Sequence, residues 1–292
     1  MGVPVRLAAA GRLRQGRGRL KEPAEQEYVL GTHDAEIERL GLQHSVWRPY
    51  ASRAWREAGF TSGQTLLDVG CGPGYATLDL ARIVGPAGRV IAMDRSRRFL
   101  DALASFSRPP GLGTIETHEL DLDADPLPDV RADGAWTRWV YSFVSKPEAL
   151  LRRVAALLRP GGTMVLHEYV DYRAWRLSSH SEAFEGFVRE VMASWRDTGG
   201  EADIGLSLPG WLESSGMRVE SLRSLGDAVR PTDYFWQWPK AFVGVGLERL
   251  VALGRIDAAR ASEIRQAFDD LERTPGGFVL NPTVLEVIAR KA

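Results

Sequence analysis

Short apolar segments and longer amphipathic segments alternate along most of the chain. Apolar runs bounded by glycine or by an acid predict buried strands. They lie at 66–69, 89–94, 114–120, 133–140 and 163–170. Between them, apolar residues recur at the spacing of a helix, most clearly over 75–81, 96–103 and 146–158. Strands that alternate with helices are typical of an α/β domain with a parallel sheet.

The chain opens with an arginine-rich stretch, residues 1–24, in which Glu22 is the first acid. We expect a disordered basic tail here, although the same composition also suits a transit peptide or an RNA-binding arm. Residues 25–60 predict two helices ahead of the sheet, the first over 34–44 with Asp34 as its N-cap.

The pattern beyond the fifth strand is helical and contains an insertion. The insertion covers 234–271, with two predicted helices separated by Gly254, and four of its first five residues are aromatic. Such a density of rings either lines a pocket or packs the insertion onto the sheet. Residues 278–280 and 283–289 complete the pattern as the last strand.

These segments divide the chain into five parts. They are a basic tail (1–24), an N-terminal helical lid (25–60), an α/β core (61–230), a helical cap insertion (231–275) and a final core strand (276–292).

The amino-acid composition excludes several classes of function. The 292 residues carry a net charge of −1, with 26% charged residues well mixed, so no overall basic field attracts nucleic acid. Cys71 is the only cysteine, which excludes a disulfide framework and a cysteine-rich metal site. No apolar run has the length of a membrane span, and the N-terminus lacks the apolar centre of a secretory signal. We therefore expect a cytoplasmic protein that binds no metal ion.

The turn after the first strand carries the candidate chemistry. Gly70, Gly72 and Gly74 follow Asp68-Val69 and open a helix. Glycines in such a turn let a ligand lie directly on the backbone, and the first N–H groups of the helix point at it. The dinucleotide fingerprint, however, places Gly or Ala where this chain has Tyr75, so a dehydrogenase is disfavoured.

Two acids narrow the choice of nucleotide. Asp68, two residues before the first glycine, would repel a pyrophosphate but attract a cation. Asp94 ends the second strand about 20 residues beyond the turn, where a carboxylate accepts both hydroxyls of a ribose. The pattern therefore indicates an adenosine that carries a positive charge and no phosphate.

With this pattern, the chain resembles the class I S-adenosylmethionine-dependent methyltransferases over roughly 66–170. The resemblance implies S-adenosyl-L-methionine as cofactor. It also implies a Rossmann-like, doubly wound sheet of seven strands, mostly parallel with the last strand antiparallel, flanked by N-terminal helices and a helical cap insertion. The residues it assigns to the cofactor at the turn and the ribose are Asp68, Gly70, Cys71, Gly72, Gly74, Asp94 and Arg95.

The resemblance also assigns residues to the two ends of the cofactor. Asp121-Leu122 and Asp123 both suit the adenine loop, in which a carboxylate accepts the N6 amine and an apolar neighbour covers the ring. Arg138 and Trp139 end the fourth strand, beside the reacting methyl group. The carboxylate of the methionine half is one partner for Arg138, and a structural salt bridge with Asp133 or Glu168 is the other.

The helix before the sheet is open to two interpretations. Many enzymes of this family lay an N-terminal helix over the cofactor, and Tyr28, Arg39 and Gln43 are then placed at its methionine end. The alternative is a surface helix with an ion pair between Glu36 and Arg39.

Candidate catalytic groups gather at the end of the fifth strand. His167 and Glu168 lie there, and Tyr141 follows the fourth strand, so each is a candidate base or orienting group. His167 is equally suited to a structural role. Methyl transfer needs little acid–base chemistry, because the cofactor carries the reactive group and the protein mainly aligns the reactants.

The sequence thus predicts a methyltransferase that acts on a small, partly apolar or aromatic molecule by in-line displacement. An RNA or protein methyltransferase that uses the arginine-rich N-terminus, and a non-catalytic S-adenosylmethionine-binding protein, are the alternatives. We expect a small-molecule methyl acceptor as partner, neither nucleic acid nor membrane, and a monomer or homodimer.

Overall fold

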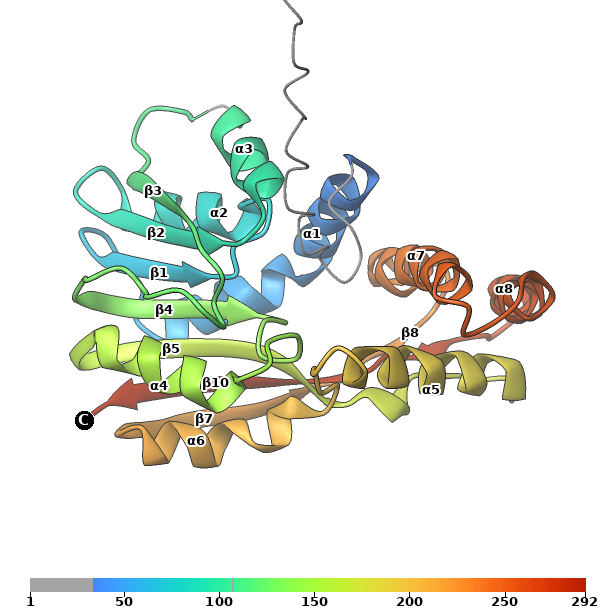
Figure 1. Cartoon of the computed structure of the whole chain (residues 1–292). Helices are drawn as coiled ribbons and strands as arrows, with labels where there is room; N and C mark the ends of the chain where they lie inside the picture. The colour runs from blue at the N-terminus through green and yellow to red at the C-terminus, as the bar shows by residue number, and fades with distance from the viewer. Residues whose placement is uncertain (1–33, 107) are drawn as a thin grey trace, which may run out of the picture.

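The computed structural model describes residues 34–106 and 108–292, and its centre is a seven-stranded sheet with the order β3-β2-β1-β4-β5-β10-β7 (Figure 1). The strands are β1 (Thr65–Val69), β2 (Arg89–Asp94), β3 (Thr114–Glu119), β4 (Ala132–Arg138), β5 (Leu158–Asp171), β7 (Met217–Leu225) and β10 (Thr283–Lys291). β10 runs antiparallel to both of its neighbours, while the pairs β1–β2, β1–β4, β2–β3 and β4–β5 are parallel. The predicted Rossmann-like sheet with an antiparallel last strand is confirmed.

Helices cover both faces of the sheet because successive side chains of each strand point to opposite faces. Leu66 packs with α1 (Asp34–Glu57) and α2 (Tyr75–Val84), whereas Leu67 packs with α4 (Pro147–Leu157) and α6 (Leu208–Ser214). α3 (Arg97–Ser105) lies on the same face as α2, and Ser96 caps it by accepting the N–H of Phe99, as predicted.

One continuous helix, α1, takes the place of the two predicted helices. It runs from Asp34 to Glu57 and passes through Pro49, which removes one backbone hydrogen bond without ending the helix. Apolar residues before and after Pro49 are buried, Trp47 against the cap and Trp55 against the sheet. Packing on both sides therefore holds the helix together across its weak point.

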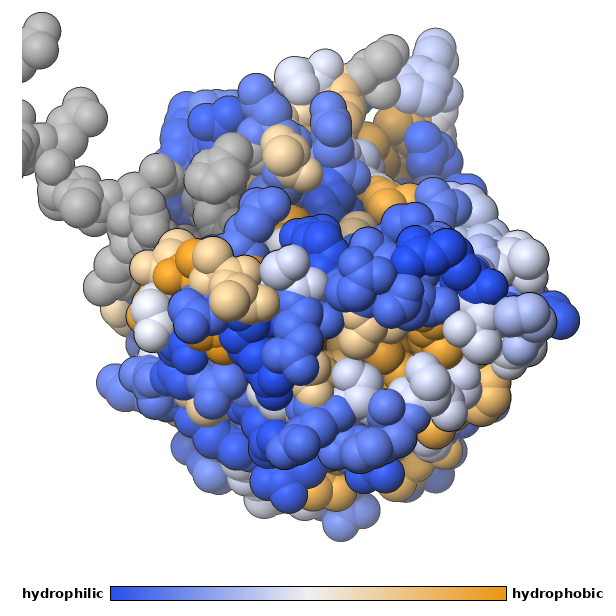
Figure 2. Space-filling view, turned by 90° about the vertical axis from the view of Figure 1, so that its right-hand side faces the viewer, coloured by the Kyte–Doolittle hydropathy of each residue, from blue (hydrophilic) through white to orange (hydrophobic). Residues whose placement is uncertain are grey.

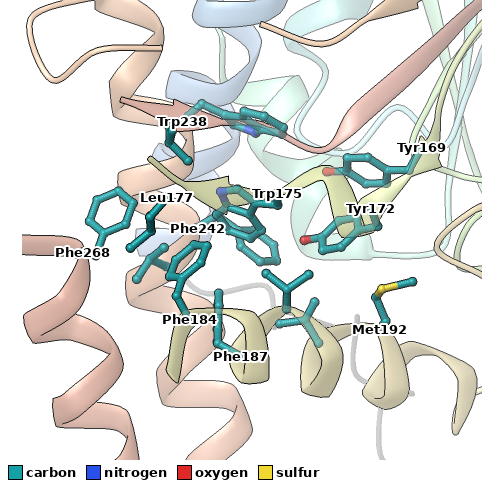
Figure 3. Close-up of a cluster of buried hydrophobic side chains, with 14 of the residues drawn as sticks. Tyr169, Tyr172, Trp175, Leu177, Phe184, Phe187, Met192, Trp238, Phe242 and Phe268 are labelled. Atoms are coloured by element: carbon teal, nitrogen blue, oxygen red, sulfur yellow. The ribbon is translucent and has the colours of Figure 1, made fainter. Parts of the chain in front are cut away.

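The cap is larger than the predicted insertion. α5 (Glu182–Arg196), α7 (Gln237–Ala252) and α8 (Ala258–Arg273) lie beyond the strand ends and share one buried cluster rich in aromatic rings (Figures 1 and 3). A small sheet joins them, made of β6 (Arg176–Leu177), β9 (Val279–Leu280) and β8 (Ala228–Val229). Residues 279–280 thus belong to this small sheet and not to the final core strand. We propose that the cap consists of two stretches, roughly 172–200 and 226–282.

Short 3₁₀ turns complete the connections. They are η1 (Tyr172–Ala174), η2 (Ile204–Leu206) and η3 (Tyr234–Trp236). η3 leads directly into α7, so the aromatic run at the start of the insertion turns back toward α1.

Candidate functional site

A cavity opens at the carboxyl ends of β1, β2 and β4, the usual ligand site of an open α/β sheet. It encloses about 1060 Å³, open solvent at its mouth included. Twelve of the residues predicted to bind the cofactor line it: Gln43, Asp68, Gly70, Cys71, Gly72, Asp94, Arg95, Asp121, Leu122, Asp123, Arg138 and Trp139. Segments far apart in the sequence therefore converge on one site.

The glycine turn forms the floor of this cavity. Gly70, Gly72 and Gly74 all have positive φ, between 54° and 84°. A Cβ on Gly70 would lie 2.4 Å from Val140, whereas one on Gly72 would meet nothing within 4 Å, so the backbone of Gly72 is open to a ligand. Gly74 does not line the cavity, contrary to expectation, because it ends the turn as the N-cap of α2 and packs against Leu103.

Asp94 is held beside the turn by backbone N–H groups. Its carboxylate accepts from Gly72 N and Ser96 N, each at 2.8 Å, and burial raises its pKa although these hydrogen bonds oppose the rise. A carboxylate oxygen can accept more than one hydrogen bond, so Asp94 keeps acceptor capacity for a donor such as a hydroxyl. Arg95, the next residue, also lines the cavity.

Hydrogen bonds in the loop after β3 distinguish the two residues predicted to bind adenine, Asp121 and Asp123. Both oxygens of Asp123 accept backbone N–H groups of Ser145 and Lys146, which fixes that carboxylate to the start of α4. Asp121 accepts the N–H of Asp123 on Oδ1 at 2.9 Å, and its Oδ2 accepts no hydrogen bond from a described residue. Asp121 is therefore the better placed to accept an amine, with Leu122 as its apolar neighbour.

Arg138 ends β4 without a carboxylate partner among the described residues. Asp133 pairs with Arg159, and Glu168 accepts hydrogen bonds from the backbone after β4, so neither forms the predicted salt bridge. One guanidinium nitrogen, Nη2, lies 3.2 Å from His44 Nδ1, and Nη1 has no partner in the described chain. Burial lowers the pKa of Arg138 to about 10, so the group remains charged and lacks an anion.

His44 connects Arg138 to a second ion pair. Arginine only donates, so Nδ1 of His44 accepts, and its Nε2–H donates to Asp79 Oδ2 at 3.0 Å. Burial lowers the pKa of His44, which agrees with the neutral ring. Burial alone would raise the pKa of Asp79, but hydrogen bonds from His44 and Arg48 outweigh it and bring the pKa to about 2.

Asp68 supplies a titratable charge beneath the cavity. Its carboxylate accepts the Thr77 hydroxyl at 2.6 Å, and burial raises its pKa to about 7 even though Thr77 and the charge of Arg138 lower it. A cation bound above this carboxylate would favour its ionised form.

Aromatic rings form the wall beyond Arg138. Trp139 has a φ of 52°, the only positive φ among the described residues other than glycine, and its ring is stacked between Tyr169 at 5.3 Å and Trp238 at 5.7 Å. The indole N–H of Trp139 has no acceptor in the described part of the chain. A strained, bulky residue at a ligand site is a common mark of function.

The comparison with known families agrees with this geometry. Residues 67–166 match the family described as "Methyltransferase domain", and the matched segment contains the glycine turn, Asp94, the loop with Asp121, and Arg138. Over these residues the chain is a class I S-adenosylmethionine-dependent methyltransferase domain. This domain implies S-adenosylmethionine as the cofactor.

Relatives match this methyltransferase over part of their length. The demethylmenaquinone methyltransferase of Lactococcus lactis is 29% identical over 152 residues, which are 51% of this chain and 57% of that protein. An uncharacterized 37.1 kDa protein from a transposon of Streptomyces fradiae is 37% identical over 106 residues, 36% of this chain and 30% of that protein. The chain thus spans between about a third and three fifths of the length of these curated relatives.

Solved structures support the fold. The structure of coclaurine N-methyltransferase bound to N-methylheliamine and SAH superimposes with a TM-score of 0.51 at 17% identity, covering 81% of this chain and 70% of that one. At this identity the likeness shows the shared architecture only.

The first helix of the methyltransferase contributes differently from the prediction. Gln43 lines the cavity, where its side-chain oxygen accepts from Arg39 at 3.0 Å and from Trp238 Nε1 at 3.2 Å. Arg39 does not line it and is instead paired with Glu36 at 2.7 Å, which is the alternative interpretation of this helix. Tyr28 lies outside the described residues.

The three predicted catalytic residues do not line the cavity of the methyltransferase, and each is fully buried. His167 Nε2 lies 3.0 Å from the carboxylate of Glu286, and burial lowers its pKa. Glu168 accepts the backbone N–H groups of residues 140–142, and burial raises the pKa of Tyr141 far above its ordinary value. All three are enclosed away from the cavity, so their catalytic roles stay predictions that this geometry does not favour.

Several cavity residues were not predicted. His44, Tyr75, Trp136 and Phe143 line it. Tyr75 donates its hydroxyl proton to the carbonyl of Ile37 and stacks on His44, so it fastens α1 over the glycine turn. The sequence places His44 and Tyr75 on predicted helices and indicates the helix face on which each lies. It does not indicate which residues their side chains contact.

Proposed function

We propose that this chain binds S-adenosylmethionine in the cavity and transfers its methyl group to a small, partly apolar or aromatic molecule. One observation carries the proposal: Asp94, Asp121 and Arg138 stand around a single cavity with unused acceptor or donor capacity. These are the groups that a ribose, an exocyclic amine and a carboxylate require.

Each of these residues then binds a different part of the cofactor. Asp94 accepts the ribose hydroxyls, Asp121 accepts the adenine amine with Leu122 against the ring, and Arg138 binds the carboxylate of the methionine half. Asp68 favours the positive charge of the ligand. The cofactor itself supplies an electrophilic methyl group on a sulfonium.

The acceptor is proposed to lie against the aromatic wall. Trp139 and Phe143 line the cavity beside Arg138, and Trp238 of the cap stacks on Trp139. This surface suits a flat or apolar acceptor, and the unpartnered indole N–H of Trp139 suits an oxygen on it. The name of the Lactococcus lactis relative, a demethylmenaquinone methyltransferase, favours the same class of acceptor.

Catalysis is proposed to rest on alignment and exclusion of water. Of the predicted base candidates, His167, Glu168 and Tyr141 do not line the cavity. The chain then contributes by holding the acceptor against the rings at the strand ends, which lowers the entropic part of the barrier. An acceptor whose nucleophilic atom is already weakly acidic would need no side-chain base.

We further propose a cytoplasmic monomer or homodimer whose partner is the small-molecule acceptor. In the described chain, no helix is long and apolar enough to cross a membrane. On the face that carries the cap, hydrophilic side chains surround separate apolar patches (Figure 2).

The test is transfer of a tritiated methyl group from S-adenosylmethionine to fractions of small metabolites. We expect label in an apolar or aromatic fraction with the full chain, equal labelling after deletion of residues 1–24, and at least tenfold less with Asp94→Asn. Label in RNA or protein that disappears with residues 1–24 would contradict the proposed acceptor class. Binding of the cofactor without any labelled product would contradict the catalytic role.

A further inference from the structure

A second cavity lies between α1 and α2, on the sheet face opposite α4. Its volume is about 660 Å³, open solvent at its mouth included. Arg48 and Arg56 of α1 and Arg82 of α2 stand around it, together with Asp79, while Trp55 and Phe60 supply apolar surface. This rear cavity lies outside the methyltransferase cavity described above.

Positive charge exceeds negative charge in the rear cavity. Asp79 is its only acid, and Arg48 donates to both Asp79 oxygens, at 2.6 Å from Nε and 3.0 Å from Nη2. Arg82 donates to the same carboxylate. Arg56 makes no ion pair or hydrogen bond with the described residues. Two guanidinium groups, each about half exposed, therefore share one carboxylate, and the exposed third, that of Arg56, stands beside them without an acid. This arrangement favours an added anion.

The apolar part of the rear cavity includes a residue whose hydrogen-bond donor lacks an acceptor in the described chain. Trp55 is 1% exposed, and its indole N–H has no acceptor among residues 34–106 and 108–292. Phe60 lies beside it in the cavity wall. A ligand that matches these groups carries a flat apolar body as well as an anionic head.

Two pairs of residues separate the rear cavity from the cofactor cavity. His44 lines the cofactor cavity and Asp79 the rear one, and the two are joined by a 3.0 Å hydrogen bond. Trp136 and Trp55 form the second pair, with ring centroids 5.1 Å apart in a T-shaped contact. A change at Asp79 thus reaches Arg138 through a single imidazole.

We propose that the rear cavity is a regulatory site for a small organic anion, a phosphate or carboxylate borne on a flat apolar group, whose binding weakens the binding of the cofactor. The bound anion attracts Arg48 and Arg82 away from Asp79. The carboxylate of Asp79 then keeps only its hydrogen bond from His44. The charged groups around His44 are Asp79, Arg138 and Arg48. With the arginines withdrawn, Asp79 favours the imidazolium form, which has no lone pair for Arg138 and displaces it.

Direct binding tests the site itself. Phenyl phosphate and benzoate are titrated into the full chain by calorimetry at constant ionic strength, with inorganic phosphate and phenol as probes of the head and the ring alone. We expect one of the two organic anions to bind at least tenfold more tightly than inorganic phosphate, and the difference between them identifies the preferred head. Arg56→Gln should weaken it at least tenfold, and Arg265→Gln, an exposed arginine of α8, should not. No binding, or equal binding to Arg56→Gln, overturns the site.

Coupling is measured with S-adenosylhomocysteine. Its dissociation constant is first determined alone, so that a failure of the cofactor proposal shows separately. Saturating organic anion should then raise that constant at least threefold, and S-adenosylhomocysteine should weaken the anion by the same factor. The effect should vanish in Arg56→Gln and persist in Arg265→Gln. An unchanged constant overturns the regulatory role.

Discussion

Arg138 donates one hydrogen bond to a histidine, while its Nη1 has no partner in the described chain. We predict that Arg138→Gln weakens S-adenosylhomocysteine binding tenfold or more, because a charge-assisted hydrogen bond is worth about 1.5–3 kcal/mol. The affinity for 5′-methylthioadenosine, which lacks the carboxylate, should change less than threefold. Calorimetry on both ligands checks this, with the exposed Arg152→Gln as control. Equal losses for both ligands would place the carboxylate elsewhere.

Asp68 gives the cofactor site a pH dependence. Its pKa of about 7 lies above the ordinary value, so the carboxylate is neutral below pH 7 and charged above it. A cationic ligand favours the charged form, and we predict that S-adenosylmethionine binds more weakly as the pH falls from 8 to 6, approaching tenfold per unit at the acid end. At pH 7 binding should release part of a proton, counted by calorimetry in buffers of different ionisation enthalpy.

The matched variant for this prediction is Asp68→Asn, which should release no proton from this position. Burial lowers the pKa of His44 below its ordinary value, so protonation of His44 lies toward the acid side of that of Asp68. Proton release that is zero in the native chain, or unchanged in Asp68→Asn, would refute the assignment.

Residues at strand ends were predictable from the sequence, and residues paired across elements were not. Asp94 and Arg138 follow short apolar runs, so their edge of the sheet could be inferred. His167 also ends such a run, but its partner Glu286 lies 119 residues later on β10, and only the folded sheet brings the two together. The same holds for His44 and Asp79, which lie on different helices.

Gln43 joins α1 to the cap through a side-chain hydrogen bond. Its side-chain oxygen accepts from Trp238 Nε1 of α7, and Trp238 is buried against Trp139. We predict that Gln43→Leu lowers the free energy of unfolding by about 1–3 kcal/mol, since it leaves a buried indole N–H without an acceptor. Urea denaturation measures this loss. Gln266→Leu, on the exposed face of α8, should change the same quantity by less than about 0.5 kcal/mol.

Two of the helices, α7 and α8, were predictable from the sequence pattern, whereas the full length of α1 was not. Periodicity located α7 and α8 on either side of Gly254, because their apolar faces are regular and glycine is suited to the αL position that ends the first one. It did not predict that α1 continues past Pro49. A proline normally signals an end, and the burial of Trp47 and Trp55 on two different surfaces is a tertiary effect.

The cap and the strand ends share one apolar cluster, whereas each face of the sheet has a buried cluster of its own. A single buried cluster contains Trp47 of α1, Trp139 at the end of β4, Phe184 of α5 and Phe268 of α8. Figure 3 shows the rings of this cluster arriving from both the strand ends and the cap helices. An insertion bounded at 231 and 275 cannot contain this cluster, because eight of its twelve buried aromatic residues lie outside that range.

A shared interior predicts a single unfolding transition that responds to the ligand as a whole. S-adenosylhomocysteine at about 100 times its dissociation constant should stabilise the fold by about 2.7 kcal/mol and raise Tm by about 5 °C. Scanning calorimetry should show one peak that moves, and hydrogen exchange should slow in α7 and α8 as well as in β1 and β4. The cap helices gain protection because Trp238 rests on Trp139, which lines the ligand cavity. Two peaks, with only the sheet responding, would mean that the cap unfolds independently and that the aromatic cluster is not a cooperative unit.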